Sequence, residues 1–437
     1  MIYTLEVLKA HEGDCMLLHW GTRAQPKLAV VDGGPSDTYE TYLRPRLDLI
    51  QSKRQPSPLE IEFVMVSHVD NDHIVGVKKM FSDLHSEVQR QVPEANRPIK
   101  VRRLWHNTFD DVVANRLSAH YEQFTASFTA DGSGELPSGS RDIIKQGLEE
   151  RGEAEDDDQA EHLALDISKV LAGHAEARDL RDKHRFLYQA QAIGGLNRPF
   201  THRGGSTLIT AELTPRPLSV AGLTFHIVGP RQAEIEALQA DFDAYLQKKG
   251  LNTAEATLAA YADNRVPNLS SIVCIGSIDV GGTRKSILLT GDARGDKMIE
   301  GLRSAGYLSG NADEHLHVNV LKVPHHGSNR NVRRDFFRKI TADVYVLSGD
   351  GKHGNPDVEV FEWITESRRR DEDFTIAMTY SVAVTDARRK AEARSPWQDE
   401  RHSIAHFVSA KRQEGYSFRL EEDAPILIEL GDEAIDW

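Results

Sequence analysis

Cysteines and long apolar runs are both scarce in this sequence. The chain of 437 residues contains two cysteines. Cys15 and Cys274 each lie in an apolar run typical of a strand, which favours buried free thiols over a disulfide framework. No apolar run approaches the roughly 20 residues that cross a bilayer, and the first residues lack the basic and apolar regions of a signal peptide. We therefore expect a cytoplasmic protein with no membrane partner.

Positive charge is in deficit as well. The formal net charge is −14 at pH 7. Such a chain repels polyanions overall, so contact with nucleic acid would need a local basic patch or bound metal ions. Hydrophobic residues make up 39% of the chain, which is enough for one large domain or two modest ones. Composition alone indicates an ordinary globular protein and argues mildly against a nucleic-acid partner.

The densest group of metal-capable side chains follows a predicted buried strand at residues 61–66. Such strand ends are where α/β sheets usually present their chemistry. Four potential ligands stand there close together: His68, Asp70, Asp72 and His73. Two imidazoles and two carboxylates suit zinc, manganese or iron, and their number favours two ions. A solvated polar turn is the alternative, but desolvated carboxylates and imidazoles need partners or a metal.

Two later strand-like runs also end in potential ligands. Residues 286–292 form an apolar run that ends in Asp292, which either binds metal or caps a following helix. Residues 318–326 form another, which ends in His325 and His326. Only one of two adjacent side chains at a strand end can easily point at the same ion. We therefore expect one of these two histidines to be a ligand.

The stretch at residues 67–73 resembles the His-x-His-x-Asp-His signature of the metallo-β-lactamase fold hydrolases. Its His-x-Asp-x-Asp-His form is similar to that of the ComEC-like hydrolases of DNA-uptake channels and of the phosphorylcholine esterases. The Gly-Asp-Cys piece at 13–15, the Asp-Gly-Gly-Pro piece at 32–35 and the Asn-x-x-Ser piece at 268–271 resemble other parts of that family. Over most of residues 2–363, the motifs follow one another in the same order as in that family. It implies an α/β fold, the metallo-β-lactamase αββα sandwich.

The resemblance implies two divalent metal ions, zinc or manganese, held by His68, Asp70, Asp72, His73, Asp292 and His326. Asp292 would bridge the ions, and Asp32 would support the site from behind the ligands or cap a turn. Asp70 stands where most of the superfamily has histidine, which favours harder ions. The candidate catalytic residues are Asp72, His325 and His353. His353 takes the place of a tyrosine in a segment that resembles the family's Ser…Tyr-Gly-His-Pro.

The same resemblance sets the expected domain organisation. Residues 1–366 would form the hydrolase domain, with a helical insertion at about 112–200, and residues 367–437 a C-terminal extension packed on the core. The extension contains a strand-like run at 374–385 between basic clusters at 368–370 and 388–390. These clusters either position phosphates or are solvated surface. His106, at another strand end, either lines the pocket or is structural.

A metal-dependent hydrolase follows from this pattern. The metals would activate a water for attack on a phosphodiester, so a phosphodiesterase or nuclease acting on a nucleotide or nucleic acid is the first expectation. The same fold hosts other chemistry. A hydrolase of a small ester, lactone or amide is one alternative, and a non-catalytic binding module is another.

Overall fold

The computed structural model describes residues 1–54, 57–107, 175–200, 208–236, 270–393 and 396–437, with a few single positions between 107 and 175. Most of the insertion predicted at about 112–200 lies outside the described residues. Its described end, residues 175–189, is helical. The Asn-x-x-Ser piece is described only from Ser270 onward.

The first sheet has six strands in the order β16-β1-β2-β3-β5-β7. The strands from β16 to β3 are antiparallel, and β3, β5 and β7 are parallel. Their bounds are β1 (Ile2–Val7), β2 (Cys15–Thr22), β3 (Gln25–Gly33), β5 (Phe63–Val66), β7 (Leu104–His106) and β16 (Ile426–Glu429). A separate parallel pair consists of β4 (Leu59–Ile61) and β6 (Ile99–Val101).

The second sheet has eight strands in the order β15-β14-β13-β12-β11-β10-β9-β8. Antiparallel pairing from β8 to β11 gives way to parallel pairing from β11 to β15. The bounds are β8 (Leu218–Val220), β9 (Leu223–Gly229), β10 (Val273–Val280), β11 (Thr283–Leu289), β12 (Leu316–Lys322), β13 (Ile340–Leu347), β14 (Thr375–Met378) and β15 (Arg419–Glu422).

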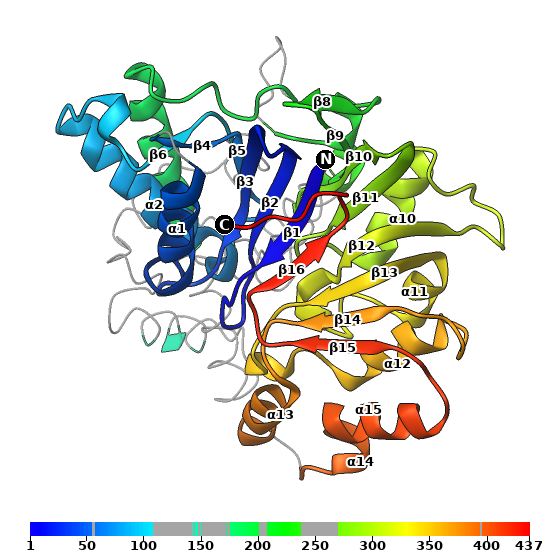
Figure 1. Ribbon diagram of the computed structural model, residues 1–437. Helices are drawn as coiled ribbons and strands as arrows, with labels where there is room; N and C mark the ends of the chain where they lie inside the picture. Colours follow the sequence, from blue (N-terminus) through cyan, green and yellow to red (C-terminus); the bar gives the residue numbers. More distant parts are fainter. Residues whose placement is uncertain are drawn as a thin grey trace.

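The helices lie outside the two sheets (Figure 1). Their bounds are α1 (Arg44–Arg54), α2 (Asn71–Gln89), α10 (Gly295–Ser304), α11 (Arg334–Lys339), α12 (Val358–Glu366), α13 (Val382–Ala391), α14 (Asp399–His402) and α15 (Ile404–Gln413). Short helical turns lie at Tyr39–Leu43, Glu94–Asn96, Ala211–Leu213, Pro324–Gly327 and Lys352–Gly354.

Three apolar clusters account for this layering. One cluster lies between the sheets, where Phe63 of the first sheet packs against Phe225 of the second with ring centroids 5.2 Å apart. Another joins the first sheet to α1 and α2, and a third joins the second sheet to α10, α11 and α12. Strands that are apolar on both faces suit such a sandwich, because each sheet is covered on two sides. The predicted α/β class is confirmed.

The chain after residue 366 enters both sheets. It supplies β14 and β15 to the second sheet and β16 to the first. The strand predicted at 374–385 is correct only to Met378, because Ser381 begins helix α13. The Ser381 hydroxyl accepts a hydrogen bond from the Val384 N–H at 3.3 Å, as a helix N-cap does. The basic cluster at 388–390 therefore stands in the last turn of a helix, where cations are favoured.

Candidate metal centre

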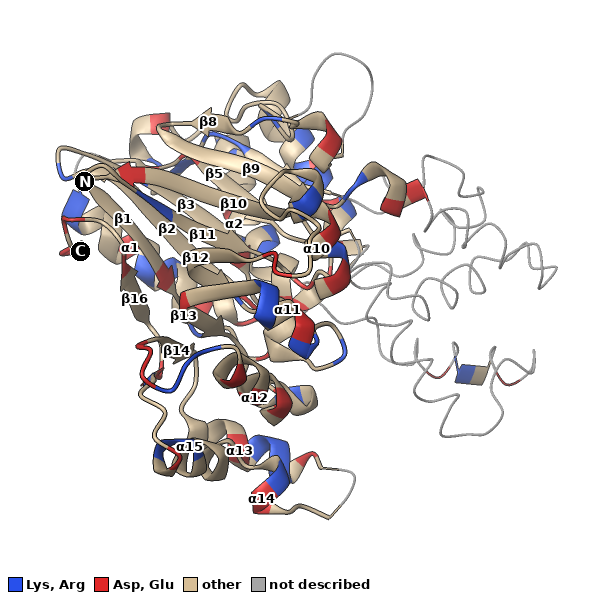
Figure 2. Cartoon of the chain, turned by 90° about the vertical axis from the view of Figure 1, so that its right-hand side faces the viewer, with Lys and Arg blue, Asp and Glu red and all other residues tan. Residues whose placement is uncertain are grey.

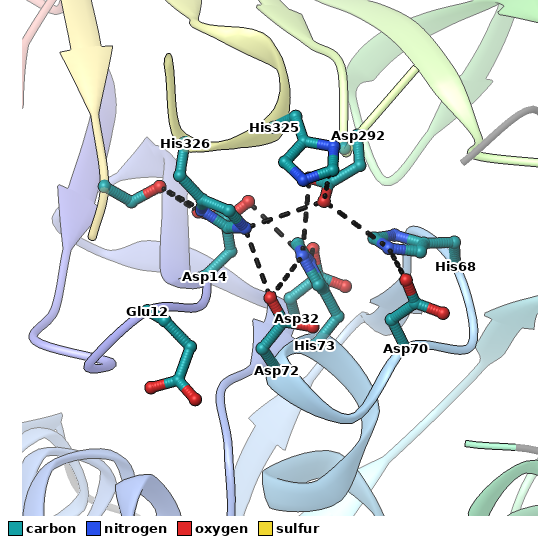
Figure 3. Close-up of polar contacts among 12 residues, drawn as sticks. Glu12, Asp14, Asp32, His68, Asp70, Asp72, His73, Asp292, His325 and His326 are labelled. Atoms are coloured by element: carbon teal, nitrogen blue, oxygen red, sulfur yellow. Dashed lines mark hydrogen bonds and ion pairs between the residues drawn. The ribbon is translucent and has the colours of Figure 1, made fainter. Parts of the chain in front are cut away.

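The three ligand motifs predicted from the sequence meet at one edge of the sandwich (Figure 3). Each follows the carboxyl end of a strand: β5 of the first sheet, and β11 and β12 of the second. We use the name Asp/His cluster for the six predicted ligands that the structure brings together there: His68, Asp70, Asp72, His73, Asp292 and His326. The cluster thus lies at the junction of the two sheets.

Asp292 is the common neighbour of three imidazoles. Its Oδ1 lies 3.4 Å from Nε2 of His73, and its Oδ2 lies 3.7 Å from Nε2 of His68 and 3.6 Å from Nε2 of His326. Asp72 adds Oδ2 at 3.3 Å from Nε2 of His326 and 3.8 Å from Nε2 of His73. Asp70 places Oδ2 3.5 Å from Nε2 of His68. Every Nε2 atom of the cluster therefore faces two carboxylates.

These facing atoms have no hydrogen-bond partners among the described residues. Nε2 of His68, His73 and His326 is buried without one, and so is Oδ1 of Asp292. The contacts of 3.3–3.8 Å exceed the usual 2.7–3.2 Å of an N–H···O bond. Ligand atoms about 2.0–2.2 Å from one tetrahedral ion lie about 3.3–3.6 Å from each other. The spacing and the unpaired atoms both fit a shared cation.

The opposite ring nitrogens are held by hydrogen bonds. Nδ1 of His73 lies 3.0 Å from Oδ2 of Asp32, and Nδ1 of His68 lies 3.1 Å from the Ser67 hydroxyl, which donates to Asp32 at 2.8 Å. Nδ1 of His326 lies 3.0 Å from the hydroxyl of Ser348. A proton on each Nδ1 leaves the Nε2 lone pair free for a metal, the usual arrangement behind metal-binding histidines. Asp32 thus supports the cluster from behind.

Asp14 is a fourth member of the closest group of possible ligands. Asp14, His73, Asp292 and His326 each offer a ligand atom, these atoms lie within 4.8 Å of one another, and all four residues are buried. These four residues could hold a metal ion. Asp14 is absent from the predicted ligands, because the Gly-Asp-Cys piece that contains it resembled only an opening strand of the family. The signals were the buried strand that follows it at once and the lysine inside the apolar run of β12, Lys322, which needs a buried partner.

Close backbone contacts hold the loops of the cluster together. A Cβ added to Gly13 would lie 1.9 Å from the carbonyl oxygen of Asp72. A Cβ on Gly291, which has a φ of +49°, would lie 2.9 Å from Cβ of Ser67. Only glycine permits such approaches. These two positions therefore bring Asp14 next to Asp72, and Asp292 next to His68.

Both adjacent histidines after β12 face Asp292, and the expectation that only one of them is a ligand stays a prediction. Nδ1 of His325 lies 3.5 Å from Oδ2 of Asp292, close to the 3.6 Å of His326. The backbone of both residues is left-handed, with φ of +48° and +52°, so the alternation of a strand does not apply. Left-handed non-glycine residues are strained, and such strain gathers at functional sites.

Charges in the cluster shift its pKa values strongly. Burial lowers the pKa of His326, yet the charges of Asp292 and Asp14 outweigh it and raise that pKa to about 9. Burial also opposes protonation of His73, but Asp292 and Asp32 raise its pKa well above the usual value. Conversely, the neighbouring histidines hold the pKa of Asp292 well below its usual range despite burial. The cluster retains carboxylate charge that attracts cations.

Two other histidines from the sequence analysis lie elsewhere. His353 belongs to the turn Lys352–Gly354 and is exposed, and its backbone N–H donates to Glu392 at 2.9 Å. His353 is thus an exposed side chain of this turn, and the catalytic role predicted for it stays a prediction. His106 is buried at the end of β7, where burial and the charge of Arg181 hold its pKa well below the usual value and so favour the neutral form.

Arginines of the two basic clusters are engaged within the fold. Arg368 is buried and donates to the Ala342 carbonyl at 3.2 Å. Arg389 is also buried, donates to the Gly354 carbonyl at 2.9 Å, and lies over the Trp397 ring. Arg388 forms an ion pair with the buried Asp350. Figure 2 shows basic and acidic residues interspersed along α10 to α15, which is the pattern of a mixed surface.

Comparison with protein-family models finds no match for the chain, and comparison with curated proteins finds none either. Among the described residues, no helix combines the length and the apolar character that crossing a membrane requires.

Proposed function

We propose that this protein is a metal-dependent hydrolase of the metallo-β-lactamase fold. One observation carries the proposal: three buried Nε2 atoms, two from the segment after β5 and one from the turn after β12, converge on Asp292 without hydrogen-bond partners among the described residues. Buried polar atoms without partners are costly, and a divalent ion satisfies imidazole and carboxylate ligands together. The layered sandwich and the order of the ligand motifs along the chain support the choice of fold.

The positions of the carboxylates favour two ions. His68 and Asp70 would hold one, and Asp72, His73 and His326 would hold the other. Asp292 would contribute to both, because its carboxylate faces His68 of the first group as well as His73 and His326 of the second. Ions held in this way supply a water that is a nucleophile near neutral pH and stabilise negative charge at the attacked centre.

His325 is the residue we assign to the substrate. Its side chain is 29% exposed, whereas those of His68, His73 and His326 are at most 4% exposed. An imidazole at this boundary can contact the attacked group and give a proton to the leaving oxygen. Nδ1 of His325 lies 3.5 Å from Asp292, so that proton donor would stand next to the bridging carboxylate.

A phosphodiester is the proposed substrate class. The carboxylates of Asp70, Asp72 and Asp292 make up half of the proposed ligands, and oxygen ligands suit the harder ions that act on phosphoryl groups. The net charge of −14 and the internal pairing of Arg388 and Arg389 disfavour a long polyanion. We therefore favour a small nucleotide phosphodiester over a nucleic-acid polymer. Esters, lactones and amides are the competing substrates in the test.

The test combines metal analysis with a substrate screen. Purified protein should contain a divalent metal and hydrolyse bis-p-nitrophenyl phosphate. Cyclic nucleotides, RNA, single- and double-stranded DNA and small esters then rank the substrate classes. Asp292→Asn should lose metal and activity, whereas Asp296→Asn, a nearby exposed carboxylate paired with Arg294, should keep both. A chain that binds no divalent ion after reconstitution would refute the proposal.

A further inference from the structure

A lysine is completely buried beside the Asp/His cluster. Lys322, the last residue of β12, has 0% of its surface exposed. Its Nζ lies 2.8 Å from Oδ2 of Asp14 and donates to the Val323 carbonyl at 3.0 Å. A buried ammonium is very costly without an opposite charge. Asp14 supplies that charge. Asp14 directly precedes β2 of the first sheet, whereas Lys322 ends β12 of the second.

Asp14 approaches the histidines from one side only. Its Oδ1 lies 3.5 Å from Nδ1 of His326 and accepts a hydrogen bond from Ser348. Its Oδ2 lies 3.7 Å from Nδ1 of His73. Asp72 and Asp292, in contrast, face the Nε2 atoms of the same two rings. The close-up in Figure 3 shows Asp14 behind His326, away from Asp292.

The two nitrogens of an imidazole point to different edges of the ring. A cation bound by both Nε2 atoms lies on the Asp72 and Asp292 side, and Asp14 lies on the other. Proximity within 4.8 Å therefore groups Asp14 with the ligands, but the direction of its contacts separates it from them. Both carboxylate oxygens of Asp14 are also engaged, one by Ser348 and one by Lys322.

We propose that Lys322 holds Asp14 as a positioning carboxylate behind His73 and His326, outside the set of metal ligands. The inference deepens the proposed function and rests on its metal centre. The relay from Nδ1 of His326 through Ser348 to Asp14 keeps the Nε2 lone pair of His326 aimed at Asp72. Lys322 compensates the charge of Asp14, so this carboxylate remains a hydrogen-bond acceptor instead of a cation ligand.

Zinc binding to the full-length chain distinguishes a positioning carboxylate from a ligand. Asp14→Asn should keep the wild-type zinc stoichiometry and bind about 10–100-fold more weakly in a chelator competition, as losses behind metal ligands usually do. Asp292→Asn should lower the stoichiometry itself. An Asp14→Asn variant that loses as much zinc as Asp292→Asn would overturn the inference, and so would one with unchanged affinity.

Thermal unfolding of the metal-free protein tests the role of Lys322. Lys322→Met and Asp14→Asn should each lower Tm, because each leaves one buried group of the pair without its partner. The double variant should lose less than the sum of the two, since the pair is removed as a unit. Additive losses would show that Lys322 is not the partner of Asp14. If a single variant does not fold, the zinc stoichiometry of the double variant is measured instead. We expect the wild-type stoichiometry, and a reduced stoichiometry would contradict the inference.

Lys78→Met is the matched control. Lys78 is another buried lysine, with Nζ 2.6 Å from Glu176. It lies further along α2 than Asp72 and His73 and is paired outside the Asp/His cluster. This variant should lower Tm while leaving zinc affinity unchanged. A wild-type chain that binds neither zinc nor any other divalent ion would refute the proposed function and the inference together. The inference alone is refuted if the wild-type chain binds zinc but the Asp14 and Lys322 variants give the contradicting results. These are zinc loss equal to that of Asp292→Asn, unchanged zinc affinity, or additive losses of Tm.

Discussion

Nε2 of His326 lies 3.3 Å from Oδ2 of Asp72, so a histidine that follows a strand of the second sheet meets a carboxylate that follows a strand of the first. Neither sheet alone forms the site. The two segments contribute side chains whose Nε2 atoms have no hydrogen-bond partners among the described residues, and under the proposed function a cation would lie between them.

Replacement of the two adjacent histidines should separate binding from turnover. His326→Ala should lower metal content and reduce kcat by about 100-fold or more, because a ligand is lost. His325→Ala should keep most of the metal and lower kcat alone, since this partly exposed ring is assigned to the substrate. Metal analysis and steady-state kinetics on the same preparations check this. Equal metal loss in both variants would make His325 a ligand.

Manganese should support activity at least as well as zinc. Asp70 offers oxygen where an imidazole would favour zinc, and hard ligands shift preference toward manganese and magnesium. Asp70→His should move the preference toward zinc. The measurement is turnover of the chelated protein after titration with each metal. Activity of the wild-type chain with zinc alone would contradict the role given to Asp70.

Gly13→Ala should disrupt the site through the backbone. The added Cβ would lie 1.9 Å from the carbonyl of Asp72, a distance that forces one loop to move. We expect weaker metal binding together with a lower Tm. The control is Gly276→Ala, where the nearest atoms are side-chain atoms at 3.4 Å or more. Unchanged metal affinity in the Gly13 variant would show that Asp72 tolerates this movement.

Glu314 should contribute a pH-dependent part of the stability. The hydrogen bond from Arg303, with further help from Lys339, lowers its pKa from 4.5 to about 2. A depressed pKa means that the stabilisation is present above about pH 4.5 and is lost as the pH falls toward 2. Glu314→Gln should therefore lower Tm at pH 7, and the difference from wild type should shrink below pH 4.5. A difference that is independent of pH would exclude the ion pairs as its cause.

The Asp/His cluster was predictable because its members end apolar strands. Residues such as Asp292 and His68 follow buried runs, and strand ends gather at one edge of a sheet, so motif order was enough to bring them together. Asp14 and Lys322 were not predictable in this way. Their pairing joins the two sheets, and no local pattern states which buried lysine meets which buried aspartate.

Local backbone geometry explains the other differences. The left-handed conformation of His325 and His326 cannot be predicted from two histidines after a proline. The sequence therefore predicted that only one of the two side chains points at the metal. Residues 374–385 carry the β-branched residues of a strand, but Ser381 is an N-cap that turns the second half into α13. The backbone conformation of a few residues decided both cases.

The passage from β15 to β16 has a mechanical consequence for the metal centre. Only Asp423, Ala424 and Pro425 separate a strand paired with β14 of the second sheet from one paired with β1 of the first. So short a tether limits how far one sheet can slide over the other. Because the proposed ligands follow strands of both sheets, that limit would fix the spacing between them before any cation binds, and binding would need little reorganisation.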